Sequence, residues 1–328
     1  MKPIEFHPVP AVIGALVVGL AMSAQSVGSI QRILRLTPEE KEILGHMQIV
    51  QLDDAQGGLA KTIRFTGVNV QIVNGLGATN GLPGDPDSVD LLVTQTNSVG
   101  NLIVGYNEMG NPVGDNRTGS HNIVAGHGNN YVTFGGLVAA RDNTSSGAYA
   151  CVTGGDQNRA IANFAAINGG RNGLASGVEA TVSGGLAGVA SGLQSAVNGG
   201  AVCSAVGVTA AVGGGNQNLA SGVFSSVSGG EQNQATGHGA SVTGGQGNLA
   251  TANYTWVGGG NLNEAGGNHS SVSGGHTNIA LGFWSSVGGG QANTAGPANQ
   301  NFVTVSGGMG RSTLSSHDWV GGGLLEDD

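Results

Sequence analysis

A short unit recurs every 15 residues through more than half of this chain. Each copy places a valine or isoleucine before one small residue and two glycines, as in Val152-Thr153-Gly154-Gly155. The pattern repeats at Ile167, Val182, Val197, Val212, Val227, Val242, Val257, Val272 and Val287, then after one 18-residue interval at Val305, and last at Val320. A fixed short period predicts a stacked architecture in which each turn contacts mainly its neighbours.

The composition narrows the kind of stack. Of 328 residues, 63 are glycine, and only 9% are charged and 4% aromatic. Disorder and collagen both tolerate abundant glycine, but the chain has only 8 prolines, no glycine at every third position, and apolar residues in fixed columns. We therefore expect an ordered protein with a thin core of valine and alanine.

The columns of the repeat predict the shape of one coil. Counted from the second glycine, alanine stands five residues on in ten copies, and glycine stands seven residues on in seven. Valine and alanine are expected to point inward. The Gly-Gly and Ala-x-Gly sites are expected at corners that need positive φ or a close approach. Each unit then has two short strands and two turns, so the predicted fold class is all-β, a β-solenoid or narrow β-roll of 15-residue coils.

An asparagine column three residues after the second glycine predicts a structural ladder. Side-chain amides stacked at a corner can bond to the next asparagine and to backbone groups. The predicted ladder consists of Asn158, Asn218, Asn233, Asn248, Asn263, Asn278 and Asn293.

Two further columns, eight and nine residues after the second glycine, carry larger apolar residues. Since small residues fill the core and corners, some of these side chains must lie outside, and exposed apolar rows usually mark contacts. We interpret them as an interface for self-association, with ligand contact or scattered surface residues as alternatives. The set is Phe164, Val178, Leu193, Val208, Val223, Phe224, Tyr254, Phe283 and Trp284.

The N-terminal third is organised differently. Residues 11–22 form a short apolar run after Lys2, which predicts a signal peptide over residues 1–25, with a buried segment or retained anchor as the alternative. Residues 26–99 are expected to form a cap, residues 100–325 the β-roll domain, and residues 326–328 an acidic tail. We therefore expect an extracellular or cell-surface location and no integral membrane domain beyond the leader.

The cap carries local signals. Thr37-Pro38-Glu39-Glu40 predicts a capping box and a helix from Pro38 to about Met47. Residues 48–52 read as a strand, and residues 61–73 alternate as a second strand with an irregularity at Gly67.

The repeat resembles the head of trimeric autotransporter adhesins, the YadA-like head, in a Ser-Val-Ser-Gly-Gly variant. The nearest stretch, residues 226–237 (SVSGGEQNQATG), keeps that family's Ser-Val, Gly and Ala-x-Gly columns but adds one residue and an outer asparagine. The likeness covers about residues 120–325 and implies a left-handed roll and a homotrimer. The chain carries neither the heptad stalk nor the membrane-anchor barrel of that family, so we expect display or release by other means.

The sequence offers little chemistry. Charged groups in the repeat fall in different columns, so no acid–base cluster is expected, and we predict no enzyme and no cofactor. His121 and His127 are weak metal candidates beside ordinary loop histidines. Asp85, Asp87 and Asp90 suit a solvated turn better than a Ca²⁺ site, so no metal is expected.

Charge and thiols exclude other classes. A net charge of −9 without a basic cluster argues against a nucleic-acid partner. Cys151 and Cys203 lie too many coils apart for a disulfide and are expected to be buried small residues. The predicted function is an exported, non-enzymatic structural or adhesin-like protein that attaches to an unknown extracellular surface, matrix or cell. The alternatives are an ice- or carbohydrate-binding solenoid, an enzyme on a β-solenoid, and a phage or fibre shaft.

Overall fold

The computed structural model of the chain describes residues 36–321, except positions 56, 298 and 314. The expected signal peptide and acidic tail lie outside the described residues. The chain divides into two compact units, one ending at Gln71 and one beginning at Ile72, so residues 72–99 group with the second unit. Among the described residues, no helix is long and apolar enough to cross a membrane.

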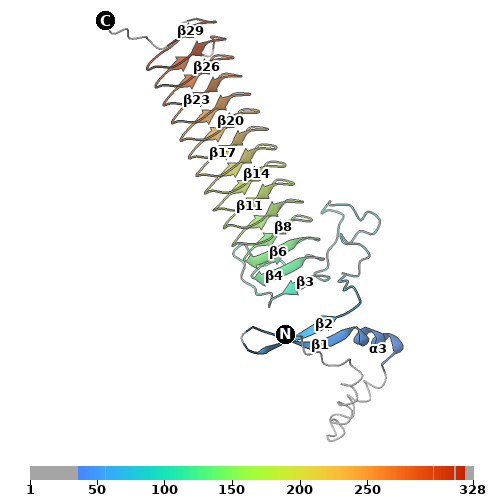
Figure 1. The fold of residues 1–328 in the computed structure, drawn as a ribbon. Coiled ribbons are helices and arrows are strands. Elements are labelled where there is room, and N and C mark those ends of the chain that lie inside the picture. The colour runs from blue at the N-terminus through green and yellow to red at the C-terminus, as the bar shows by residue number, and fades with distance from the viewer. Residues whose placement is uncertain (1–35, 56, 298, 314, 322–328) are drawn as a thin grey trace. The chain divides into compact units, whose positions relative to one another are not determined.

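The first unit is a helix followed by a β-hairpin (Figure 1). Helix α3 (Pro38–Gly45) begins with a reciprocal capping box: the Glu40 N–H donates to the Thr37 hydroxyl, and the Thr37 N–H donates to the Glu40 carboxylate. Strand β1 (Met47–Asp53) pairs antiparallel with β2 (Leu59–Phe65). The helix therefore ends two residues before the predicted Met47.

The second predicted strand was too long. Strand β2 ends at Phe65, opposite Met47, because β1 supplies no further partner residue beyond that pair. The Thr66 N–H then bonds to the His46 carbonyl, and Gly67 turns the chain with φ +74°. The alternating apolar residues 68–73 lie outside any strand.

The second unit is a parallel β-solenoid, which confirms the predicted fold class (Figure 1). Equivalent residues of successive coils pair in register, as Val227 does with Val242. The strands form two long sheets. The valine sheet, which has 15 strands, consists of β3 (Leu102–Val104), β4 (Ile123–His127), β6 (Leu137–Arg141), β8 (Cys151–Val152), β10 (Ala166–Ile167), β12 (Thr181–Val182), β14 (Ala196–Val197), β16 (Ala211–Val212), β18 (Ser226–Val227), β20 (Ser241–Val242), β22 (Trp256–Val257), β24 (Ser271–Val272), β26 (Ser286–Val287), β28 (Thr304–Val305) and β29 (Trp319–Val320).

The second sheet faces the valine sheet across the interior of the roll. We call it the alanine sheet. Its 12 strands are β5 (Asn130–Tyr131), β7 (Thr144–Ser145), β9 (Arg159–Ala160), β11 (Leu174–Ala175), β13 (Val189–Ala190), β15 (Ser204–Ala205), β17 (Leu219–Ala220), β19 (Gln234–Ala235), β21 (Leu249–Ala250), β23 (Glu264–Ala265), β25 (Ile279–Ala280) and β27 (Thr294–Ala295).

Each coil also contains a third paired position that the sequence did not reveal. Glu231 forms single bridges to its copies Asn216 and Gln246 in the coils on either side. It lies between Gly230 and Gln232, which both adopt left-handed φ values of +88° and +55°. Two such corners around one extended residue leave room for a bridge but not for a strand.

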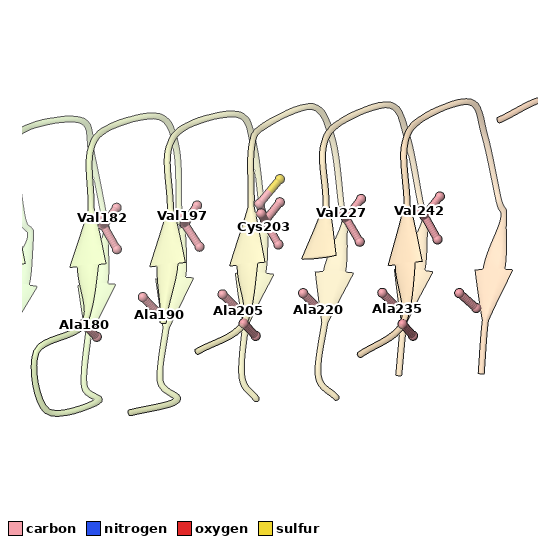
Figure 2. Close-up of a cluster of buried hydrophobic side chains, with 14 of the residues drawn as sticks. Ala180, Val182, Ala190, Val197, Cys203, Ala205, Ala220, Val227, Ala235 and Val242 are labelled. Atoms are coloured by element: carbon pink, nitrogen blue, oxygen red, sulfur yellow. The ribbon is translucent and has the colours of Figure 1, made fainter. Parts of the chain in front are cut away.

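The core is the thin stack that the columns predicted. The valines of the repeat are at most 1% exposed, and the alanines of the alanine sheet are fully buried. Figure 2 shows these side chains meeting across the interior, with Ala235 and Val242 from the two sheets among them. Because alanine fills one wall, the two sheets approach closely and the repeated coils enclose only these small side chains.

Two glycine columns are required for two different physical reasons. The second glycine of each pair is left-handed: Gly230 has φ +88°, and a Cβ there would lie 2.2 Å from the Gly245 carbonyl oxygen. Gly222, in the Ala-x-Gly column, has no such φ, but its Cβ would lie 1.9 Å from the Gly237 carbonyl oxygen. The first glycine of the pair differs from both, since nothing lies within 4 Å of a Cβ built on Gly229.

Candidate functional site

The asparagine column forms a buried ladder that joins one coil to the next. Asn248 is fully buried and represents the others. Its carbonyl oxygen accepts the Asn263 backbone N–H at 3.0 Å, and its amide nitrogen donates to the carbonyls of Gly244 at 2.8 Å and Gly260 at 3.0 Å. The rungs therefore run from side chain to backbone, and they satisfy the polar groups exposed by the glycine corner.

The structure places the seven predicted asparagines in two groups. Six follow one another from Asn218 to Asn293, while Asn158 stands apart, because Gly173, Gly188 and Cys203 occupy the ladder position between them. The Cys203 thiol lies 3.5 Å from the Gly214 carbonyl and partly fills the space of an amide. Both cysteines are free thiols, Cys203 buried and Cys151 half-buried.

Sequence analysis missed two members of the ladder. Asn129 and Asn143 make the same contacts ahead of Asn158: the Asn143 N–H bonds to the Asn129 side chain at 3.0 Å, and the Asn158 N–H to the Asn143 side chain at 2.8 Å. The spacing of 15 between Asn143 and Asn158 would have revealed one of them. Asn129 lies 14 residues before Asn143, in a coil whose length differs.

The nine residues predicted as an interface all lie on the surface. Their exposed fractions run from 37% at Val223 to 59% at Phe224. They form two adjacent columns at the corner after the alanine sheet, which we call the aromatic edge. The outer column is left-handed although it is not glycine, with φ +57° at Phe224, +56° at Tyr254 and +58° at Trp284. This conformation costs each residue about 1 kcal/mol or more, so its repetition reflects the coil geometry.

Rings along the aromatic edge stack on one another. His269 lies parallel to Trp284 with ring centroids 4.1 Å apart, and parallel to Tyr254 at 5.1 Å. Tyr149 and Phe164 stack in the same way nearer the start of the solenoid. Sequence analysis did not include the histidines, whose planar rings complete the column. Because neighbouring rings cover each other's faces, the column presents mainly ring edges to solvent.

The edge is interrupted in the middle of the solenoid. Glu179, Gln194 and Thr209 occupy the ring position there, and the Gln194 amide donates to the Glu179 carboxylate at 2.8 Å. The aromatic edge therefore consists of two apolar segments separated by a short polar one.

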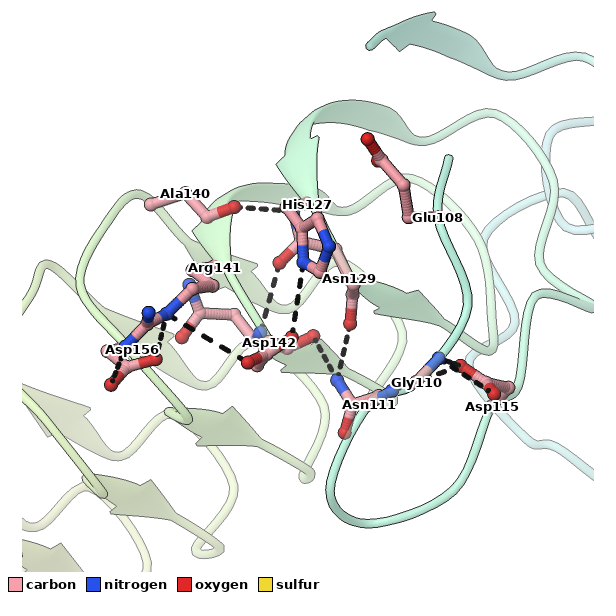
Figure 3. A network of polar contacts seen from close by, with 12 residues as sticks. Glu108, Gly110, Asn111, Asp115, His127, Asn129, Ala140, Arg141, Asp142 and Asp156 are labelled. Atoms are coloured by element: carbon pink, nitrogen blue, oxygen red, sulfur yellow. Dashed lines mark hydrogen bonds and ion pairs between the residues drawn. The ribbon is translucent and has the colours of Figure 1, made fainter. Parts of the chain in front are cut away.

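The weak metal candidates serve structural contacts instead. His121 Nε2 accepts the Asn74 N–H at 3.1 Å, so its Nδ1 donates to the Thr79 carbonyl at 3.0 Å. His127 faces the Asp142 carboxylate at 3.6 Å (Figure 3). The Asp90 carboxylate caps a turn by accepting the Leu92 N–H at 2.9 Å. Within the described residues, no group of three or more His, Cys, Asp or Glu could hold a metal ion.

The clearest electrostatic feature is an ion pair between the first coils. Arg141 donates twice to Asp156, at 2.9 and 2.8 Å (Figure 3). These hydrogen bonds lower the pKa of Asp156 and raise the pKa of Arg141. Backbone N–H groups of Asn111 and Gly110 likewise lower the pKa of Asp115. A lowered carboxyl pKa stabilises the fold above the unfolded-state pKa, and this contribution is lost as the pH falls through the folded-state pKa.

One hollow of about 320 Å³ lies between the loop around Asn111 and the first strands of the alanine sheet. Apolar Val113 and Leu174 line it together with Arg159 and a single carboxylate, that of Asp142. Hydrolysis of glycosidic bonds ordinarily uses two carboxylates that flank the bond, and this lining supplies one. Comparison of the chain with known proteins adds no further assignment: no protein-family model matches it, and no curated protein matches it.

Proposed function

We propose that this chain is an exported, non-enzymatic, adhesin-like structural protein whose solenoid is a rigid rod for attachment to a surface, matrix or cell. The observation that carries the proposal is the repetition of the same exposed columns along the whole solenoid. A repeated surface suits an extended, repetitive partner better than it suits a single small substrate. The resemblance of the repeat to YadA-like heads supports the same class.

Self-association through the aromatic edge is the second part of the proposal. The edge displays half-exposed Phe224, Tyr254 and Trp284 next to apolar Val223 and Phe283. Soluble proteins rarely leave apolar rows of this length in contact with water unless a partner covers them. The resemblance implies three copies, so we propose a homotrimer in which the edges meet.

Mass in solution tests the assembly. We expect three times the chain mass for the full-length protein, and we expect the double variant Val208→Asp/Val223→Asp to be a monomer because carboxylates would be placed inside an apolar contact. Ser228→Asp, an exposed position of the same coil on another face, is the control and should leave the trimer intact. A monomeric parent protein would overturn the trimer.

Attachment needs a separate measurement. Beads coated with the protein should adhere to cells or extracellular matrix, whereas beads coated with an unrelated exported protein of similar charge should not. Equal adhesion of the two kinds of bead would overturn the attachment function.

A further inference from the structure

The outer face of the valine sheet carries no charge. On each strand the residues on either side of the buried valine point outward, since side chains alternate along a strand. From β8 to β29 these outward positions hold only Ser, Thr, Asn, Ala, Gly, Cys and two tryptophans. We call this surface the hydroxyl face. Its neutrality is notable in a chain whose net charge is −9.

The two tryptophans of the hydroxyl face occupy the same column. Trp256 opens β22 and Trp319 opens β29, four strands further along the sheet. At about 4.8 Å per strand the two positions are about 19 Å apart. Their side chains are 42% and 67% exposed, although large aromatic groups usually bury much of their surface.

Both tryptophans have the same local setting. Gly258 and Gly321 follow them by two residues on the same face of the strand, and a Cβ at either glycine would lie 2.9 or 2.8 Å from the indole ring. The Trp256 Nε1 also donates to the Thr243 hydroxyl of the previous strand at 3.2 Å. Each ring therefore leans along its own strand over a glycine that makes room for it.

These two rings differ from the rings of the aromatic edge. Edge rings such as His269 and Trp284 stack on each other and cover each other's faces. Neither Trp256 nor Trp319 contacts another aromatic ring within the part of the chain that the structure describes. Their ring surfaces remain free for a ligand.

The surface between the tryptophans is flat and rich in hydroxyl groups. Ser271, Ser286 and Thr304 continue the tryptophan column, and the Ser271 hydroxyl donates to that of Ser286 at 3.2 Å. The next column beyond the face consists of first glycines such as Gly274, where nothing lies within 4 Å of a built Cβ. Side chains would fit there, but none is present, so the surface stays level.

We propose that the hydroxyl face binds a neutral polysaccharide, with Trp256 and Trp319 stacking on sugar rings and the serine and threonine hydroxyls bonding to sugar hydroxyls between them. The apolar C–H face of a sugar packs on an aromatic ring, and a neutral polymer has no charge for an uncharged face to compensate. The proposal deepens the attachment function and rests on it, because it names the chemistry of the surface to which the rod attaches.

A second copy of the chain fits this face less well. Its two outward columns are about 6.6 Å apart and its twelve strands extend over about 53 Å, which gives roughly 350 Å². A stable protein–protein interface needs about 800 Å² per partner. A linear glycan is itself narrow, so its length matches the face without requiring width.

Retention on insoluble polysaccharides tests the proposal with the full-length protein. We expect retention on at least one of cellulose, chitin and insoluble β-1,3-glucan, unchanged between low and high salt because no charge takes part. Trp256→Ala and Trp319→Ala should each weaken it at least tenfold, and Trp256→Phe should restore most of it. Leu262→Ala is the matched control, since Leu262 is 53% exposed in the same coil on a different edge.

Several results would overturn the glycan site. They are absence of retention on all three polymers, an equal loss in Leu262→Ala, salt-sensitive binding to alginate alone, thermal hysteresis without polysaccharide retention, and a change of solution mass in Trp256→Ala. Failure of the attachment function is distinct. Coated beads that adhere equally well to enzymatically deglycosylated matrix would refute the glycan and keep the attachment, whereas retention on polysaccharide without bead adhesion would do the reverse.

Discussion

At the scale of single residues, the Gly-Gly pair shows that identical neighbours can have different roles. Gly230 adopts a left-handed φ and approaches the carbonyl of the next coil, whereas Gly229 does neither. We expect Gly230→Ala to lower the free energy of unfolding by about 3 kcal/mol, from left-handed strain and a backbone clash. Gly229→Ala should change it by less than about 0.5 kcal/mol. Urea unfolding of both variants checks this, and equal losses would contradict it.

The asparagine ladder gives a second comparison between residues. Asn248→Ala removes three hydrogen bonds and leaves their backbone partners buried, which should cost about 3 kcal/mol or more. The control is Gln246→Ala in the same coil, whose side-chain amide also bonds to neighbouring coils but is exposed. Its loss should stay within about 0.5 kcal/mol. Similar unfolding midpoints for the two variants would show that ladder burial is unimportant.

At the scale of elements, the helix and hairpin of the first unit have little core of their own. Val50 is the one buried hydrophobic side chain among the described residues of that unit, and Ile43, Ile49 and Ile63 are each about 60% exposed. A two-stranded hairpin is marginal in water, and an eight-residue helix is too short to be stable alone.

We therefore expect a fragment of residues 36–71 to show no cooperative unfolding transition by circular dichroism. A fragment of residues 72–321 should retain a cooperative transition close to that of the full chain, because its coils bury a continuous core. A folded hairpin fragment would show that local pairing suffices.

The elements also show what the sequence could reveal. Periodicity located the coils, the inward columns and the asparagine corner, because each repeats at one spacing. It did not reveal the left-handed ring column at Phe224 and Tyr254, since only glycine signals that conformation locally. Strand β2 was predicted too long because alternation at residues 68–73 says nothing of the partner strand. The free rings of Trp256 and Trp319 depend on neighbours in other coils, which no single repeat contains.

At the scale of the whole molecule, the solenoid is a chain of coils joined by nearest-neighbour interfaces. Its stability is then a sum of local terms, and the weakest interfaces open first. Three successive coils lack the asparagine rung, at Gly173, Gly188 and Cys203. The aromatic edge is polar over the same stretch, where Glu179, Gln194 and Thr209 replace rings. The middle of the rod therefore has fewer contacts between coils than either end.

This difference predicts where the rod opens. Amide hydrogen exchange should be faster over residues 173–210 than over residues 218–293, because opening the former breaks fewer buried bonds. Cys203→Asn should slow it, since an amide at this buried position can donate to the Gly215 carbonyl, now 3.6 Å from the thiol, and accept the Asn218 N–H. A gain of about 1 kcal/mol is expected. Cys151→Ser, away from the ladder, should leave the exchange pattern unchanged. Uniform protection along the rod would mean that valine and alanine packing alone sets its stability.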